Sequence, residues 1–120
     1  MAEYVKVQLT EELRNETTEL IEKTAKKGKI KAGINEVTKA IERGTAKLVV
    51  MAEDVNPKEI VMHLPILCDE KNIPFSYIKT RKELGEKAGL RTATASIAIT
   101  ESEAEKEIKE LGKKIAELRK

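Results

Sequence analysis

Helix-start signals and short apolar runs alternate along this chain, and the alternation restricts the possible folds more than any other feature. The helix starts pair a hydroxyl or amide side chain with a glutamate in the following turn, at Thr10 to Glu12, Asn56 to Glu59, Thr80 to Glu83 and Ser102 to Glu105. The apolar runs lie between them, at residues 47–51, 74–79 and 94–100, and are typical of short buried strands. This alternation predicts an α/β fold with helices on both faces of a small sheet.

The same signals predict the bounds of each element. Helices are expected over residues 10–27, 35–43, 57–71, 80–89 and 102–118, with a short extended piece at 30–32 before the second helix. The 120 residues are the length of one domain. We therefore expect a single domain over residues 1–120, folded as a three-layer α/β/α sandwich around a small mixed, largely parallel sheet.

Composition excludes several classes of function. The single cysteine, Cys68, and the single histidine, His63, rule out an intramolecular disulfide, a CxxC metal site and a zinc site built on two histidines. The chain lacks an apolar stretch near the roughly 18 residues of a membrane span, a signal peptide and any glycine-rich phosphate fingerprint. We expect a cytoplasmic protein that is monomeric when free, with no cofactor, no metal and no membrane partner.

Charge is unevenly distributed, although the formal net charge is only +2. Residues 26–47 hold seven Lys and Arg against two Glu, and residues 79–91 hold five against two. If the fold brings these segments together, they form one basic face suited to phosphate. If it does not, they are the solvated faces of separate helices. The sequence leaves both interpretations open.

One helix start groups complementary polar side chains, in the segment Gly33-Ile34-Asn35-Glu36-Val37-Thr38-Lys39. Asn35, Glu36 and Lys39 fall on the first turn, where spacings of three and four residues bring side chains together. An amide, an acceptor and a donor side by side can read a guanine edge that normal pairing leaves open. Gly33 permits close backbone approach, and a helix N-terminus favours phosphate. The alternative is that Asn35 caps the helix, Glu36 complements its dipole and Lys39 is solvated.

Two other segments are candidate sites. The loop of residues 90–96 is small and hydroxyl-rich, with Arg91 suited to a phosphate and Leu90 to stacking on a splayed base; a plain connection is the alternative. The acidic pair Glu53-Asp54 follows a strand, where ligand sites lie in α/β sheets. Together with His63 it supports the hypothesis of a small-ligand enzyme. The alternative is that the two carboxylates order the loop that follows.

Four ordered stretches closely resemble the ribosomal protein family of the archaeal large-subunit protein L-seven-Ae: Gly33 to Gly44, Ala46 to Pro57, His63 to Cys68 and Ile73 to Phe75. The resemblance extends from about Tyr4 to the C-terminal helix. It implies an α/β/α sandwich that binds kink-turn and kink-loop RNA, in which tandem sheared G·A pairs follow a sharply bent bulge. It implies no catalytic activity of the protein itself.

The resemblance also implies roles for individual residues. Asn35, Glu36 and Lys39 would read the guanines of the G·A pairs, with Gly33 beside them. The pocket and clamp for the flipped-out bulge nucleotide would be formed by Ile60, Arg81, Leu90, Arg91, Thr92 and Ala93. Relatives often carry an Arg-Pro pair in this loop, whereas this chain has Arg91-Thr92-Ala93, so its loop lacks the restraint of a proline.

The implied partners are RNAs and other subunits of ribonucleoproteins. The RNAs are 23S-type rRNA in the large ribosomal subunit, box C/D and H/ACA guide RNAs for 2′-O-methylation and pseudouridylation, and ribonuclease P RNA. An alternative function stays open, namely a protein-binding adaptor on the same scaffold with only nonspecific RNA affinity. The weak net charge and the departure in the loop support that alternative.

Overall fold

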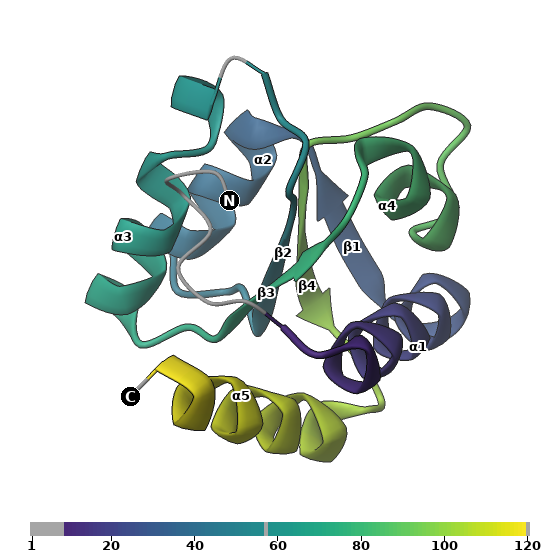
Figure 1. The fold of residues 1–120 in the computed structure, drawn as a ribbon, viewed down its shortest axis with the longest axis vertical. Helices are drawn as coiled ribbons and strands as arrows, with labels where there is room; N and C mark the ends of the chain where they lie inside the picture. Colours follow the sequence, from purple (N-terminus) through teal and green to yellow (C-terminus); the bar gives the residue numbers. More distant parts are fainter. Residues whose placement is uncertain (1–8, 57, 120) are drawn as a thin grey trace.

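The computed structural model describes residues 9–56 and 58–119, except for the side chain of Ile60. The elements follow in the order α1 (Glu11–Lys27), β1 (Lys29–Ala32), α2 (Ile34–Glu42), β2 (Leu48–Ala52), the 3-10 helix η1 (Lys58–Ile60), α3 (His63–Lys71), β3 (Phe75–Ile78), α4 (Arg81–Lys87), β4 (Ser96–Glu101) and α5 (Glu105–Arg119). Figure 1 shows their arrangement. None of the described helices is both long and apolar enough to cross a membrane.

Helices cover both faces of a four-stranded sheet, as predicted. The strand order is β1-β4-β2-β3. Helices α2 and α3 lie on one face, and α1, α4 and α5 lie on the other (Figure 1). Strand β2, between β4 and β3, is buried along its whole length, while the edge strand β1 alternates between exposed and half-buried residues. The hydrophobic core therefore lies on both sides of β2.

The sheet is mixed, as predicted. The prediction that it is largely parallel is wrong, because more of its neighbouring strands pair antiparallel than parallel. Strands β2 and β3 pair in parallel, whereas β4 pairs antiparallel with both β1 and β2. Strands β1, β2 and β3 thus run in one direction, and β4 inserts between two of them against that direction. Residues 96–99 of β4 are all buried, so this strand requires a neighbour on each side.

The prediction of one helix over residues 57–71 is also wrong. After η1 the chain makes a turn, and α3 begins only at His63. Pro65 explains the break, because it lacks an N–H and its ring clashes with the carbonyl four residues earlier in a continuous helix. In α3 it occupies the first turn, where a backbone N–H has no helical partner in any case.

Local signals are confirmed at the starts of α1 and α4 and at the end of α3. The start predicted at Ser102 is not, because α5 begins at Glu105 and the Ser102 hydroxyl accepts from the N–H of Ala104 at 3.0 Å. The Thr10 hydroxyl accepts a 3.2 Å hydrogen bond from the backbone N–H of Leu13, and the Thr80 hydroxyl accepts one of 3.1 Å from Glu83. Asn72 ends α3 in the left-handed conformation, with φ 57°. These features depend on residues close in sequence, so a sequence pattern is sufficient to predict them.

A polar contact helps to fix α1 against the sheet. The buried Thr17 hydroxyl donates to the carbonyl of Leu13 at 2.8 Å and lies 2.7 Å from the buried Ser76 hydroxyl in β3. Leu20 and Ile21, on the same side of the helix, belong to the core. The first half of α1 therefore has a defined position relative to the end of β3.

Candidate nucleic-acid interface

Four connections meet at one edge of the sheet. Strand β1 leads into α2, β2 into the turn at Glu53 and Asp54, and β3 into α4, while β4 begins after the loop of residues 90–95. Because β4 runs against the other three strands, its start lies at the same edge as their ends, toward the top of the view in Figure 1. The carboxyl ends of parallel strands are where α/β sheets bind ligands. Most of the predicted site residues lie in these connections.

The start of α2 is set by Gly33, which has φ 93° and ψ 153°, a conformation almost restricted to glycine. Its N–H donates to the Ser96 carbonyl at 3.0 Å, and its carbonyl accepts from the N–H of Val37 at 3.0 Å. Gly33 is the N-cap residue, and no side chain among the described residues caps the helix. The alternative in which Asn35 caps this helix is therefore wrong. Asn35 lies inside the first turn, with its side chain exposed.

Glu36 and Lys39 are also exposed, on the same turn as Asn35. The ammonium of Lys39 lies 4.0 Å from Oε1 of Glu36, and both side chains are more than half exposed. Such a surface pair is weak, so both groups are available to a ligand. We call Gly33, Asn35, Glu36 and Lys39 the helix half of the candidate interface. It offers an amide, a carboxylate and an ammonium beside the free amides of a helix N-terminus.

Arg81, the first residue of α4, links two other connections. Its backbone N–H donates to Oδ1 of Asp54 at 2.9 Å, and its Nε lies 3.7 Å from the same oxygen. Its carbonyl accepts from the N–H of Thr94 at 3.2 Å. Arg81 thus joins the turn after β2 to the loop before β4, while its side chain remains about half exposed.

The loop of residues 90–95 is held at both ends although it lacks the family's proline. The Leu90 N–H donates to the Gly85 carbonyl at 2.9 Å, and the Ala95 carbonyl accepts from the N–H of Ala52 at 3.0 Å. Leu90, Arg91, Thr92 and Ala93 are exposed. We call Arg81 and these four residues the loop half of the candidate interface.

Gly85 is a residue that the sequence reasoning missed. A Cβ at this position would collide with the backbone oxygen of Thr92, so the loop lies directly on α4. An isolated glycine inside a short helical pattern was the available signal, since it costs about 1 kcal/mol relative to alanine and so points to a packing reason. Asp54 was interpreted either as part of a ligand site or as ordering its own turn, and its contact with Arg81 spans 27 residues. No local pattern predicts a contact of that kind.

The remaining candidate site residues, Ile60 and those of the enzyme hypothesis, are not part of either half of the candidate interface. The side chain of Ile60 lies outside the described residues. The residues of the enzyme hypothesis each contact a different partner: Glu53 bonds Arg14, Asp54 bonds Arg81, and Nε2 of His63 lies 3.0 Å from the Thr38 hydroxyl. These contacts favour the interpretation in which the two carboxylates order their loop. In the described part of the chain, no three His, Cys, Asp or Glu residues are grouped to hold a metal ion.

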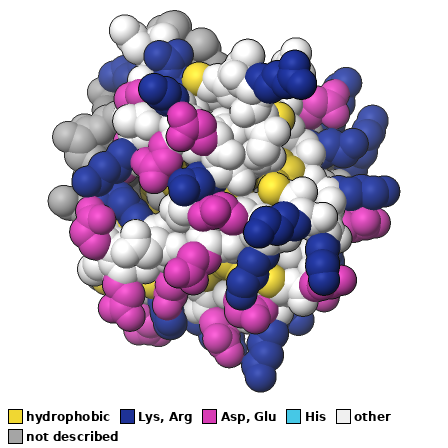
Figure 2. Space-filling view, turned by 90° about the vertical axis from the view of Figure 1, so that its right-hand side faces the viewer, with side chains coloured by type: hydrophobic (Ala, Val, Ile, Leu, Met, Phe, Trp, Pro, Cys, Tyr) yellow, Lys and Arg dark blue, Asp and Glu magenta, His cyan; other side chains and the backbone are white. Residues whose placement is uncertain are grey.

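The two basic segments approach each other on the side formed by α1, α4 and β1. A Cβ at Gly89, after α4, would lie 3.9 Å from the Cβ of Ala25 near the end of α1. Figure 2 shows Lys and Arg side chains concentrated on the right-hand half of this side, whereas Asp and Glu are more frequent on the left. Lys26, Lys31 and Arg91 are exposed. The second segment therefore lies beside the part of the first segment at the end of α1, whereas Lys39 and Arg43 belong to α2 and its C-cap on the other face of the sheet, so the two segments form one basic face only in part.

Comparison with known proteins agrees with this geometry. Residues 15–109 match the model of the ribosomal protein L7Ae/L30e/S12e/Gadd45 family. The chain belongs to this family. Among solved structures it is similar to the 15.5kD RNA binding protein of Giardia lamblia, with 32% sequence identity and a TM-score of 0.90 over 98% of this chain and 99% of that chain. The family resemblance and the α/β sandwich predicted from the sequence are confirmed, and every predicted site residue lies within the matched segment.

Proposed function

We propose that this protein binds kink-turn and kink-loop RNA and stabilises the bent form. The observation that carries the proposal is the helix half, where Asn35, Glu36 and Lys39 lie exposed on the first turn of α2. Gly33 anchors that turn at the edge of the sheet where the loop half also lies. Membership of the L7Ae/L30e/S12e/Gadd45 family and the similarity to an RNA binding protein support it.

The side chains of the helix half match the edges of an unpaired guanine. Lys39 and the Asn35 amide can donate to guanine O6 and N7, and the Glu36 carboxylate can accept from the N1 and N2 protons. A sheared G·A pair leaves the Watson–Crick edge of the guanine open to the carboxylate, whereas a Watson–Crick pair occupies the N1 and N2 protons. The free amides of the helix N-terminus then favour an adjacent phosphate. Specific binding through this turn therefore requires the G·A pairs.

The loop half is suited to the nucleotide that the bend expels. Leu90 offers an apolar surface for stacking, and the guanidinium groups of Arg81 and Arg91 offer charge for phosphate. The mechanism is a shift of population: free RNA samples bent and extended forms, and a protein that binds only the bent form traps it. No catalytic step is required, and we propose that the protein is not an enzyme.

We further propose that the protein is a structural subunit of several complexes. These are the large ribosomal subunit with 23S-type rRNA, box C/D and H/ACA guide ribonucleoproteins, and ribonuclease P, in each case with other protein subunits. A monomeric free state, a cytoplasmic location and an archaeal source belong to the same proposal. The family's ribosomal members and the sequence motifs support it.

The test replaces the helix half while sparing the fold. The triple variant Asn35→Ala, Glu36→Ala and Lys39→Ala changes exposed side chains only, so its thermal unfolding should match the wild type within a few degrees. Its binding to a kink-turn RNA should fall to the level of a plain duplex. Tight, selective binding by the folded variant would contradict the proposal. If the wild type itself binds both RNAs equally, the adaptor alternative is favoured.

A further inference from the structure

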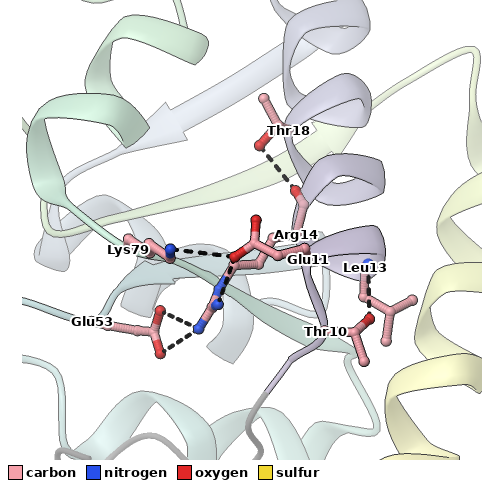
Figure 3. Close-up of polar contacts among 7 residues, drawn as sticks. All are labelled: Thr10, Glu11, Leu13, Arg14, Thr18, Glu53 and Lys79. Atoms are coloured by element: carbon pink, nitrogen blue, oxygen red, sulfur yellow. Dashed lines mark hydrogen bonds and ion pairs between the residues drawn. The ribbon is translucent and has the colours of Figure 1, made fainter.

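A partly buried ion pair joins α1 to the turn after β2. Nη2 of Arg14 lies 3.2 and 3.0 Å from the two carboxylate oxygens of Glu53, and the side chains are only 18% and 19% exposed. Glu11 lies 3.5 Å from Nη1 of Arg14 and 3.3 Å from the Lys79 ammonium. Figure 3 shows this cluster between the first turns of α1 and the ends of β2 and β3.

The partners of Glu53 lead directly into the loop half. Its backbone N–H donates to the Ile78 carbonyl at 2.9 Å, and the next residue, Asp54, accepts from the N–H of Arg81. The Arg81 carbonyl then accepts from Thr94, at the end of the exposed loop. Each successive contact joins one connection at the sheet edge to the next. The position of the loop half therefore depends on where Glu53 is held.

The energetics of the pair argue against a purely stabilising role. Partly buried ion pairs lose much of their attraction to the cost of desolvation, and an apolar pair is often equally stable. Within the described residues, Nε of Arg14 is buried without a hydrogen-bond partner, which adds to that cost. What the pair does provide is position, because both carboxylate oxygens of Glu53 are held by Arg14.

We propose that Arg14 and Glu53 are positioning residues for the loop half of the RNA interface, through Asp54 and Arg81. This inference rests on the proposed function. Neither residue contacts the RNA, and neither acts on the helix half, which is anchored separately by the hydrogen bond from Gly33 to Ser96. Loss of the pair should therefore impair recognition of the bulge nucleotide and leave recognition of the G·A pairs intact.

The experiment measures the affinity of each variant for three RNAs: a kink-turn, the same RNA with an abasic bulge position, and that abasic RNA with Watson–Crick pairs in place of the G·A pairs. For Glu53→Gln, discrimination against the abasic RNA should fall by about tenfold, the typical effect of losing one interaction with a charged group. Discrimination between the two abasic RNAs, which differ only in the G·A pairs, should stay unchanged. Electrostatics alone predicts no change in either ratio, because removing a negative charge should tighten binding to all three polyanions alike.

A double-mutant cycle tests whether Arg14 and Glu53 act together or independently. If the two residues act as one unit, Arg14→Gln, Glu53→Gln and the double variant should lose bulge discrimination to the same extent. Arg14→Lys keeps the cation without the planar guanidinium and should show a smaller loss in the same direction. It also provides a conservative variant if removal of the charge prevents folding. The matched control is Glu16→Gln, which breaks the 2.8 Å pair with Lys114 between α1 and α5 and should leave all three affinities in the wild-type ratio.

The outcomes are distinguishable. Unchanged bulge discrimination in folded Glu53→Gln, or equal loss in Glu16→Gln, would overturn the positioning role. Loss of both kinds of discrimination together would overturn it as well, since it would show a general effect on the fold. A wild-type protein that binds all three RNAs equally would instead contradict the proposed function.

Discussion

The backbone N–H of Gly33 donates a 3.0 Å hydrogen bond to the carbonyl of Ser96, which anchors the first turn of α2 to the first residue of β4. Because β4 inserts between β1 and β2, the same strand start also receives the loop of residues 90–95. The helix half and the loop half thus adjoin at this strand start, although each has its own anchor. A ligand that contacts both halves meets a preformed surface.

Replacing Gly33 tests this anchor. Gly33→Ala should destabilise the fold by about 1–3 kcal/mol, because its φ and ψ are unfavourable for any residue with a Cβ. Apart from the neighbouring backbone, no atom of the described residues lies within 4 Å of the new Cβ, so a clash with another part of the fold is not the cause. The control is Gly44→Ala at the other end of α2, which also has positive φ and open space. Both variants should unfold earlier in denaturant, and only Gly33→Ala should weaken kink-turn binding. Equal binding by the two variants would contradict the role given to Gly33.

The packing of the loop on α4 predicts a different result at Gly85. A Cβ there collides with backbone, which cannot move aside as a side chain can, so Gly85→Ala should cost about 1–3 kcal/mol and displace the exposed loop. In Gly112→Ala the Cβ would lie 3.0 Å from the Pro74 ring. There a gain in helix propensity of about 1 kcal/mol offsets the tighter contact. Chemical denaturation and RNA titration of both variants provide the measurement. An RNA affinity of Gly85→Ala equal to that of Gly112→Ala would show that the loop does not contribute.

Local chemistry explains what the sequence could predict. Thr10 and Thr80 cap their helices through residues three positions away, and the exposed turn of Asn35, Glu36 and Lys39 follows from helical spacing alone. The insertion of β4 was not predictable in this way, since alternation of helices and strands does not specify which gap a last strand fills. The break before α3 could have been predicted, because Pro65 is incompatible with the interior of the helix expected there.

Long-range contacts account for the rest of the site. Arg14 and Glu53 are 39 residues apart, and Arg81 and Asp54 are 27 apart. Each of these residues belongs to an ordinary surface pattern when its own segment is considered alone. Only the packing of α1 and α4 against the strand ends brings them together. A single segment of the sequence was therefore sufficient to predict the helix half. The arrangement of the loop half depends on contacts among four segments, namely α1, the turn after β2, α4 and the loop of residues 90–95.

The basic face predicts how strongly the affinity for RNA depends on salt concentration. Lys31 is exposed on β1, four residues before Asn35, and we expect it to contact a phosphate. Lys31→Gln should then reduce the slope of log affinity against log salt by roughly 0.7–0.9, the value for one phosphate contact, without changing the preference for G·A pairs. Lys113→Gln, exposed on α5 at a distance in the fold from β1, serves as the control. A slope that changes equally in both variants would indicate only the effect of net charge.

Cys68 predicts a pH dependence of stability. Burial raises the pKa of its thiol from 9.0 to about 12, with a smaller contribution from Asp69. The unfolded chain therefore loses this proton near pH 9 while the folded chain retains it. The stabilising contribution is complete below pH 9 and is lost as the pH rises toward 12, at up to about 1.4 kcal/mol per pH unit. Between about pH 8 and pH 10 the wild type should lose about 1.4 kcal/mol more than Cys68→Ala, as measured by denaturant unfolding. If the unfolding free energies of the wild type and Cys68→Ala change in parallel with pH, the raised pKa of Cys68 is contradicted.

The most direct test of kink-turn recognition is a titration of the wild-type protein against two labelled RNAs at two salt concentrations. One RNA carries the tandem G·A pairs, and the other carries Watson–Crick pairs in their place. We expect the preference for the G·A RNA to persist at the higher salt, because it depends on hydrogen bonds from Asn35, Glu36 and Lys39 to guanine edges. Equal binding to both RNAs that weakens in parallel with salt would contradict specific recognition and would leave only a basic face.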